Sequence, residues 1–178
     1  YALRACKYFK QRYPDVPTVW GGVHGSLVPQ QTIANPYVDI VVVGEGEVTF
    51  EQLVKALQAG TPLSRVRGIW YKGHIGGTTT ATADTADDLP PVAVDLEDGT
   101  KAYRTGERPF VKLDEQPPLS YHLVDMDHYR RPLFGIDHVS FNSSRGCVFG
   151  CKFCWAPVMH KRQWRAMEPG TVVDQLKR

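Results

Sequence analysis

The chain has 178 residues, of which 42% are hydrophobic and 22% charged, a composition typical of folded proteins and unlike that of disordered chains. A formal net charge of +2 creates no strong field, so the charge does not call for nucleic acid or an anionic membrane as a partner. No stretch approaches the roughly 18 apolar residues of a membrane span and no signal-peptide pattern occurs, so we expect a cytoplasmic protein without a membrane span.

The first residues alternate between helical and extended patterns. Leu3, Cys6 and Phe9 recur at three-residue spacing and predict a helix over residues 2–12. The short run VPTVW at 16–20 follows and has the β-branched character of a strand. Cys6 lies on the apolar face of this helix and is expected to be a small buried hydrophobic residue.

A second unit repeats this order. A short helix is predicted over 29–34, and DIVVVG at 39–44 is a continuous apolar run typical of a buried strand. The next helix is predicted over 48–59, with Gly60 and Pro62 as its stop signal. Strands that alternate with helices favour an α/β fold with a doubly wound parallel sheet.

Each of the two strands ends in a glycine-rich turn, WGGVHGS at 20–26 and GEGE at 44–47. Ligands of doubly wound sheets bind at the carboxyl ends of strands, where glycine lets the backbone approach them closely. The alternative is that these glycines only form tight turns. Neither turn has the G-x-G-x-x-G spacing and no lysine matches a P-loop, so a nicotinamide cofactor is not expected.

A connector is predicted over 61–136. RGIWYK at 67–72 is expected to form one strand of a small hairpin that ends near Gly73. The small, polar tract at 76–88 is expected to be a mobile loop, because it cannot bury enough apolar surface to offset its ordering entropy. The proline-rich segment 113–131 is expected to pack as an irregular strap between domains.

The remaining residues carry three cysteines within eight positions, in a C-x3-C-x2-C pattern that follows a strand predicted at Val139 and Phe141. Such a crowded set is a poor disulfide framework and indicates a metal site. Three thiolates can hold three corners of an iron–sulfur cubane and leave the fourth iron open to a small molecule. Such an iron can also pass an electron to that molecule, whereas zinc cannot because it is redox-inert. The alternative is a non-catalytic zinc site with His160 as fourth ligand.

These motifs resemble a known family. The loop SRGCVFGCKFC is similar to the defining loop of the radical S-adenosylmethionine (SAM) superfamily. The order of GGVH, GEGE, LDEQP to DMDHY, and SRGC resembles the subgroup with an N-terminal cobalamin-binding domain. The resemblance implies the C-terminal part of a Rossmann-like cobalamin-binding domain over 1–60, the connector, and over 137–178 the first βα unit of a partial TIM-type radical SAM barrel.

The resemblance also implies cofactor contacts, although it identifies no catalytic residue. Phe153 would lie against the adenine of S-adenosylmethionine, with a core position as its alternative. The implied ligands of a 4Fe-4S cluster are Cys147, Cys151 and Cys154. The implied contacts to the nucleotide tail of cobalamin are Gly21, Gly22, Val23, His24, Gly25, Ser26, Gly44, Glu45 and Gly46.

The implied activity is the reductive cleavage of S-adenosylmethionine by an external one-electron reductant, which yields a deoxyadenosyl radical. Methylation of an unactivated carbon in a small-molecule or peptide substrate is the expected outcome. Oxidative cyclisation, rearrangement and methylthiotransferase-like chemistry are the alternatives within the family. A zinc-binding module without activity is the alternative of another class.

The sequence departs from the family pattern in places. The family often has proline at Val148, a small residue at Trp155 and glutamate at Gln175, and none of these departures removes a cluster ligand. The histidine motif that often supplies the lower ligand of cobalt would precede Tyr1, and most of the barrel would follow Arg178. The fragment alone is therefore expected to be inactive.

Several other residues receive a structural interpretation. His24 is expected to be a loop histidine bonded to backbone and not the lower ligand of cobalt. Pro169 is expected to begin the first barrel helix, which continues to Leu176. A solvated loop face is expected for the basic residues, with binding of a ligand carboxylate as the alternative; these residues are His160, Lys161, Arg162 and Arg165.

Overall fold

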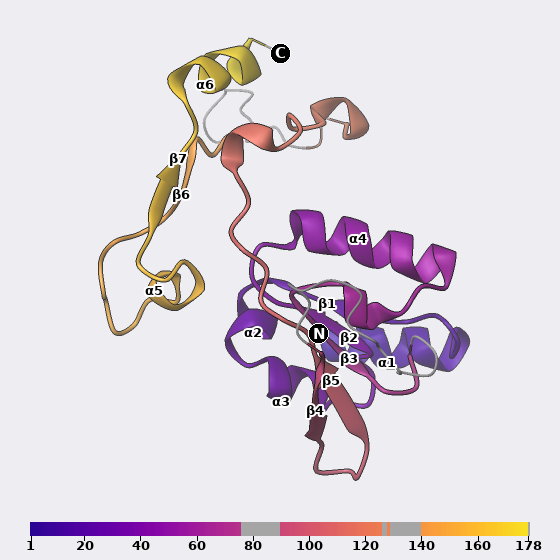
Figure 1. Ribbon diagram of the computed structural model, residues 1–178. Helices are drawn as coiled ribbons and strands as arrows, with labels where there is room; N and C mark the ends of the chain where they lie inside the picture. Colours follow the sequence, from indigo (N-terminus) through magenta and orange to yellow (C-terminus); the bar gives the residue numbers. More distant parts are fainter. Residues whose placement is uncertain (76–89, 126–127, 129–139, 178) are drawn as a thin grey trace. The chain divides into compact units, whose positions relative to one another are not determined.

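The computed structural model describes residues 1–75, 90–125, 128 and 140–177 (Figure 1). These residues divide into two compact units, Tyr1–Phe110 and Val111–Arg178, and each unit is described by itself. The polar tract predicted as a mobile loop, 76–88, lies outside the described residues.

The first unit contains the alternating elements that the sequence predicts. Its first elements are α1 (Ala2–Arg12), β1 (Val19–Trp20), α2 (Gly22–Leu27), α3 (Pro29–Ile33), β2 (Ile40–Val42) and α4 (Gly46–Ala59). The predictions of α1, α3, β2 and α4 are confirmed. Gly60 ends α4 in the left-handed conformation, with φ of 63°, which is the usual role of glycine after a helix.

Three further strands join β1 and β2 in one sheet: β3 (Ile69–Lys72), β4 (Val92–Asp95) and β5 (Lys101–Arg104). The five described strands lie in the order β1-β2-β3-β5-β4. Among the strands that the structure describes in this sheet, β1 and β2 pair in parallel, and the other pairs are antiparallel. The α/β class is confirmed, but the sheet is mixed and not wholly parallel. RGIWYK does form a strand, but it pairs with β2 and β5 inside this sheet because an apolar run specifies burial and not a partner.

The core lies on both faces of β2, as the two-residue period of a strand requires. Ile40 and Val42 contribute to a cluster that includes Leu53 of α4. Val41, between them, belongs to a second cluster that includes Ile33 of α3. Helices therefore cover the sheet on opposite faces, which is the doubly wound arrangement (Figure 1).

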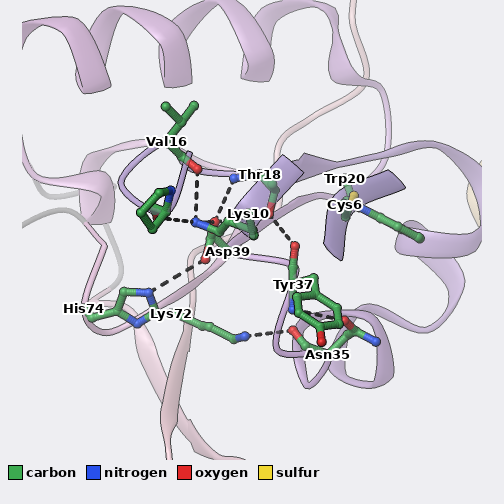
Figure 2. Close-up of polar contacts among 11 residues, drawn as sticks. Cys6, Lys10, Val16, Thr18, Trp20, Asn35, Tyr37, Asp39, Lys72 and His74 are labelled. Atoms are coloured by element: carbon green, nitrogen blue, oxygen red, sulfur yellow. Dashed lines mark hydrogen bonds and ion pairs between the residues drawn. The ribbon is translucent and has the colours of Figure 1, made fainter. Parts of the chain in front are cut away.

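A buried carboxylate anchors α1 to the start of β2 (Figure 2). Asp39 is 2% exposed, and its Oδ2 lies 2.7 Å from Lys10 Nζ and accepts a bond of 2.7 Å from the Thr18 amide. Lys10 also donates to the carbonyl oxygens of Pro14 and Val16. Burial raises the pKa of Asp39, but the bonds from Lys10 and Thr18 and the charge of Lys10 outweigh it, so the pKa lies below its ordinary value.

Replacing Lys10 with methionine should destabilise the first unit by roughly 3 kcal/mol, because it leaves the buried Asp39 without its nearest cation. The loss should lie at the low end for a broken buried pair, because the bonds from Thr18 and the His74 ring at 3.7 Å remain. The stability that Asp39 contributes in the native protein is present above the ordinary aspartate pKa and is lost as pH falls through its lowered folded pKa. Denaturant unfolding of the full-length protein at several pH values measures both effects. Lys55→Met is the matched control, because Lys55 pairs with Glu51 at the surface and should have little effect.

The second unit contains shorter elements. Its elements are η2 (Leu113–Glu115), η3 (Tyr121–Leu123), β6 (Ser144–Gly146), α5 (Ala156–Met159), β7 (Trp164–Ala166) and α6 (Pro169–Leu176). The helix predicted from Pro169 is confirmed. The strand before the cysteines lies at Ser144–Gly146 and pairs antiparallel with β7, whereas Phe141 is outside any strand and Val139 lies outside the described residues. The first βα unit of a barrel remains a prediction.

The start of the predicted strap belongs to this second unit. Arg165 Nη1 donates to the Val111 carbonyl at 2.9 Å, and the Glu168 amide donates to Asp114 Oδ1 at 2.8 Å. Both bonds join the segment around η2 to β7 and the start of α6.

The described residues of the chain include no helix long and apolar enough to cross a membrane.

Candidate functional site

The first candidate site lies where β1 and β2 end, at adjacent positions of one sheet edge. Because these two strands are parallel, Gly21 and Gly44 both lie beyond carboxyl ends at this edge. Gly21 directly follows β1 and lies against Val42, the last residue of β2, and Gly44 comes two residues after Val42. Gly22 and Gly44 each have φ of +81°, and a Cβ added at either would meet no atom within 4 Å. Both positions combine a backbone that favours glycine with open space, which suits the close approach of a ligand.

The first glycine-rich segment is a helix and not the open turn that we predicted. Gly21 precedes it with extended backbone, and α2 runs through Gly22–Leu27. Gly25 is buried, and a Cβ there would lie 3.1 Å from Val41 Cγ1. Glycine permits this close approach of α2 to β2, so tertiary packing offsets the poor helix propensity of the sequence.

The residues predicted to contact cobalamin differ in their exposure. Gly21, Gly22 and His24 are exposed, whereas Val23 and Ser26 are half-buried. At the second turn Glu45 precedes α4, and Gly46 is the first residue of that helix. Gly25 faces Val41 and is covered by the unit itself.

Ser26 connects the two glycine-rich segments. Its hydroxyl donates to the Gly22 carbonyl at 2.8 Å and accepts from the Gly44 amide at 2.9 Å. The two segments are therefore held by one side chain. Sequence reasoning gave Ser26 only as a possible ligand contact, because the parallel pairing of β1 and β2 is needed to place it beside Gly44.

The second candidate site is the loop between β6 and α5, which carries three cysteines. Cys147 follows β6 directly, and the Cys154 amide donates to the Cys151 carbonyl at 3.1 Å. All three have free thiols; Cys151 is exposed and the other two are half-buried. Within the described ranges, no set of three or more potential ligands is gathered closely enough to hold a metal ion. The three thiols are close to one another in the sequence, and their binding to one cluster remains a prediction.

The donor set of this loop nevertheless fits an iron–sulfur cluster. Three accessible thiols on one short loop supply the soft ligands that iron–sulfur clusters require. Gly146 directly precedes Cys147 and Gly150 lies between Cys147 and Cys151, and neither adds a side chain that would crowd the loop. The zinc alternative needs His160 as well, and its ring is half-buried and lies 5.7 Å from the Trp155 ring, centroid to centroid.

A strained basic turn lies against the cysteine loop. Lys161 and Arg162 have φ of 51° and 56°, a left-handed backbone that is uncommon for residues other than glycine. A Cβ at Gly150 would lie 2.8 Å from Arg162 Nη2, so the guanidinium packs on that glycine. The expectation of a solvated basic face holds only in part, because Arg165 is half-buried and bonded to the Val111 carbonyl.

Apolar side chains project from the cysteine loop into solvent. Phe153 is 94% exposed, so the described residues provide no core position for it. The other exposed apolar residues of the loop and of α5 are Val148, Phe149, Trp155 and Val158. A fully exposed aromatic beside the cysteines is available to a ligand or to another part of the protein.

Comparison with known proteins adds three findings. The family model for the B12 binding domain matches residues 1–54. An uncharacterized methyltransferase of Pyrococcus horikoshii is 32% identical over 177 residues, which cover 98% of this chain and 33% of the relative. The anaerobic magnesium-protoporphyrin IX monomethyl ester cyclase of Rubrivivax gelatinosus is 28% identical over 99% of this chain and 28% of the relative.

A cobalamin-dependent radical SAM methyltransferase of Streptomyces tokunonensis is 27% identical over 85% of this chain and 19% of the relative. No solved structure matches the chain. The chain spans a third or less of the length of these curated relatives.

Proposed function

The chain belongs to the family of cobalamin-binding radical SAM proteins, and on this premise we propose that it is part of a methyltransferase that acts on an unactivated carbon. The observation that carries the proposal is a C-x3-C-x2-C loop with three free thiols in a chain whose first residues match the B12 binding domain. Two of the relatives above bear the name methyltransferase. The substrate is proposed to be a small molecule or a peptide.

We propose that Cys147, Cys151 and Cys154 hold a 4Fe-4S cluster. When bound, this cluster supplies the electron that cleaves S-adenosylmethionine, and the methylated corrinoid supplies the methyl group. The loop keeps one face open, since Cys151 and Phe153 are exposed. Phe153 is proposed to pack on the adenine of S-adenosylmethionine, which would bury a ring that is otherwise in water.

The glycine edge of the first unit is proposed to hold the nucleotide tail of cobalamin. Gly22 and Gly44 offer open space and left-handed backbone there, so a bulky planar group could approach the main chain. Gly21 follows β1 directly, and Gly46 is the first residue of α4, after the turn that follows β2. The residues of this edge bind and orient the corrinoid, and they take no part in proton transfer.

The domain boundaries and partners complete the proposal. A cobalamin-binding domain over 1–60, a connector over 61–136 and a radical SAM domain over 137–178 are proposed. The sheet of the first unit continues past the first of these boundaries to β5. A one-electron reductant and a cytoplasmic location are proposed as well.

Oxidative cyclisation is the second candidate function. One observation favours it: the relative from Rubrivivax gelatinosus is named a cyclase and matches 99% of this chain. Both functions would use the same two cofactor sites, so the difference must lie in the substrate. Products formed with labelled S-adenosylmethionine distinguish them, because only a methyltransferase transfers the labelled methyl group to the product.

Anaerobic reconstitution of the full-length protein with iron and sulfide tests the proposal. We expect a brown protein with about four irons per chain that retains a corrinoid through gel filtration and cleaves S-adenosylmethionine when reduced. A colourless product loaded with zinc would refute the radical function. An intact cluster without retained corrinoid would refute the cobalamin site alone.

A further inference from the structure

Ser26 occupies an unusual position between the two glycine-rich segments. Its hydroxyl is the link between the Gly22 carbonyl, at 2.8 Å, and the Gly44 amide, at 2.9 Å. The first of these groups belongs to α2, after β1, and the second to the turn after β2. One oxygen atom thus joins the carboxyl ends of two neighbouring strands.

The chemistry of a hydroxyl explains why serine suits this position. A hydroxyl has one hydrogen to donate and two lone pairs to accept, so it can bond to a carbonyl and to an amide at once. Alanine would leave the half-buried Gly44 amide without this acceptor, and an unpaired buried amide is costly. Because the only hydrogen of the hydroxyl is already donated to Gly22, Ser26 has none left to donate to a ligand.

The two groups that Ser26 joins belong to residues with left-handed backbone. Gly22 and Gly44 share φ of +81°, and neither would meet an atom within 4 Å at a Cβ. Because neither glycine has a side chain to pack there, the two bonds of Ser26 are what join these two residues directly. Gly25, the residue before Ser26, packs against Val41 and so holds α2 close to β2.

We propose that Ser26 is a positioning residue that fixes the two glycine-rich segments relative to each other and so preforms the wall for the corrinoid tail. The inference rests on the proposed function, and it replaces the prediction that Ser26 itself contacts cobalamin. Preformed walls bind tightly because less ordering remains to be done on binding. Loss of the link should therefore weaken corrinoid binding while the unit stays folded.

Three variants of the full-length protein separate this role from a general effect on stability. Ser26→Ala removes both bonds, and Ser26→Thr keeps the hydroxyl. Thr32→Val is the matched control, because the Thr32 hydroxyl donates to the Val28 carbonyl at 2.9 Å, the same four-residue bond, but joins no second segment. The probe is hydroxocobalamin, titrated by its absorbance, together with thermal melting and hydrogen exchange of the segment Val43–Gly46 without corrinoid.

We expect Ser26→Ala to raise the Kd for hydroxocobalamin about tenfold and to speed exchange around Gly44, while the melting transition is lowered but stays cooperative, so that the unit is folded during the titration. Ser26→Thr should restore the Kd, and Thr32→Val should leave it unchanged. Equal binding by native protein and Ser26→Ala, or equal weakening by Thr32→Val, would overturn the inference. If the native protein binds no hydroxocobalamin, the proposed function itself fails, which is a different and recognisable result.

Discussion

Replacing Cys151 with alanine is expected to abolish the proposed iron–sulfur cluster and, with it, the proposed cleavage of S-adenosylmethionine. A cubane held by three thiolates of one loop has no spare protein ligand, so one missing thiolate leaves two irons exposed. Changes to groups that only support a ligand already cost 10- to 100-fold in such sites, so loss of a ligand should cost at least about a hundredfold. Iron content and the yield of deoxyadenosine after reduction measure the effect in the full-length protein.

Cys151→Ala should leave the fold intact, because Cys151 is exposed. Cys6→Ala is the matched control: its sulfur accepts a bond from Trp20 Nε1 at 3.1 Å within the first unit, and its loss should leave the iron content unchanged. His160→Ala should also leave it unchanged. If the native protein binds zinc and no iron, and His160→Ala loses that zinc, the loop is a zinc site instead.

The sequence predicts elements of this fold better than their partners. Periodicity and stop signals suffice for α4 and β2, because their apolar residues are the ones that pack. The helix α1 forms where its periodicity predicts it, although it has no buried residue and Leu3 and Phe9 are exposed. Strand direction is different, since an apolar run such as RGIWYK specifies burial but not which neighbours it joins. The antiparallel addition of β3 beside β2 depends on contacts between distant residues and leaves no local signal.

The candidate site shows the same division. The cysteine spacing and the two glycine-rich segments are visible in the sequence, whereas α2 is not, because its glycines oppose helix formation and only the seat of Gly25 on Val41 favours it. The left-handed turn at Lys161 and Arg162 is equally hidden, since neither residue favours that backbone. Both features are imposed by packing.

Replacing Gly146 with alanine is expected to be as damaging as losing a cysteine, although Gly146 binds nothing. It is the last residue of β6, directly before Cys147, and has φ of +97°. A Cβ there would lie 1.9 Å from the Gln163 carbonyl oxygen and 3.3 Å from His160 Cβ. Because the nearest atom belongs to the backbone, β6 and β7 must separate, at a cost of roughly 3 kcal/mol or more.

Separation of these strands would displace Cys147, whose position depends on the pairing of Gly146 with Trp164. We therefore expect Gly146→Ala to lose the cluster and to lower the melting temperature, whereas Cys151→Ala loses the cluster alone. Gly170→Ala is the matched control, since a Cβ there meets nothing within 4 Å and the position lies in the first turn of α6. Full iron content in Gly146→Ala would contradict the paired β6–β7 arrangement, because no alanine fits that position while the strands remain joined.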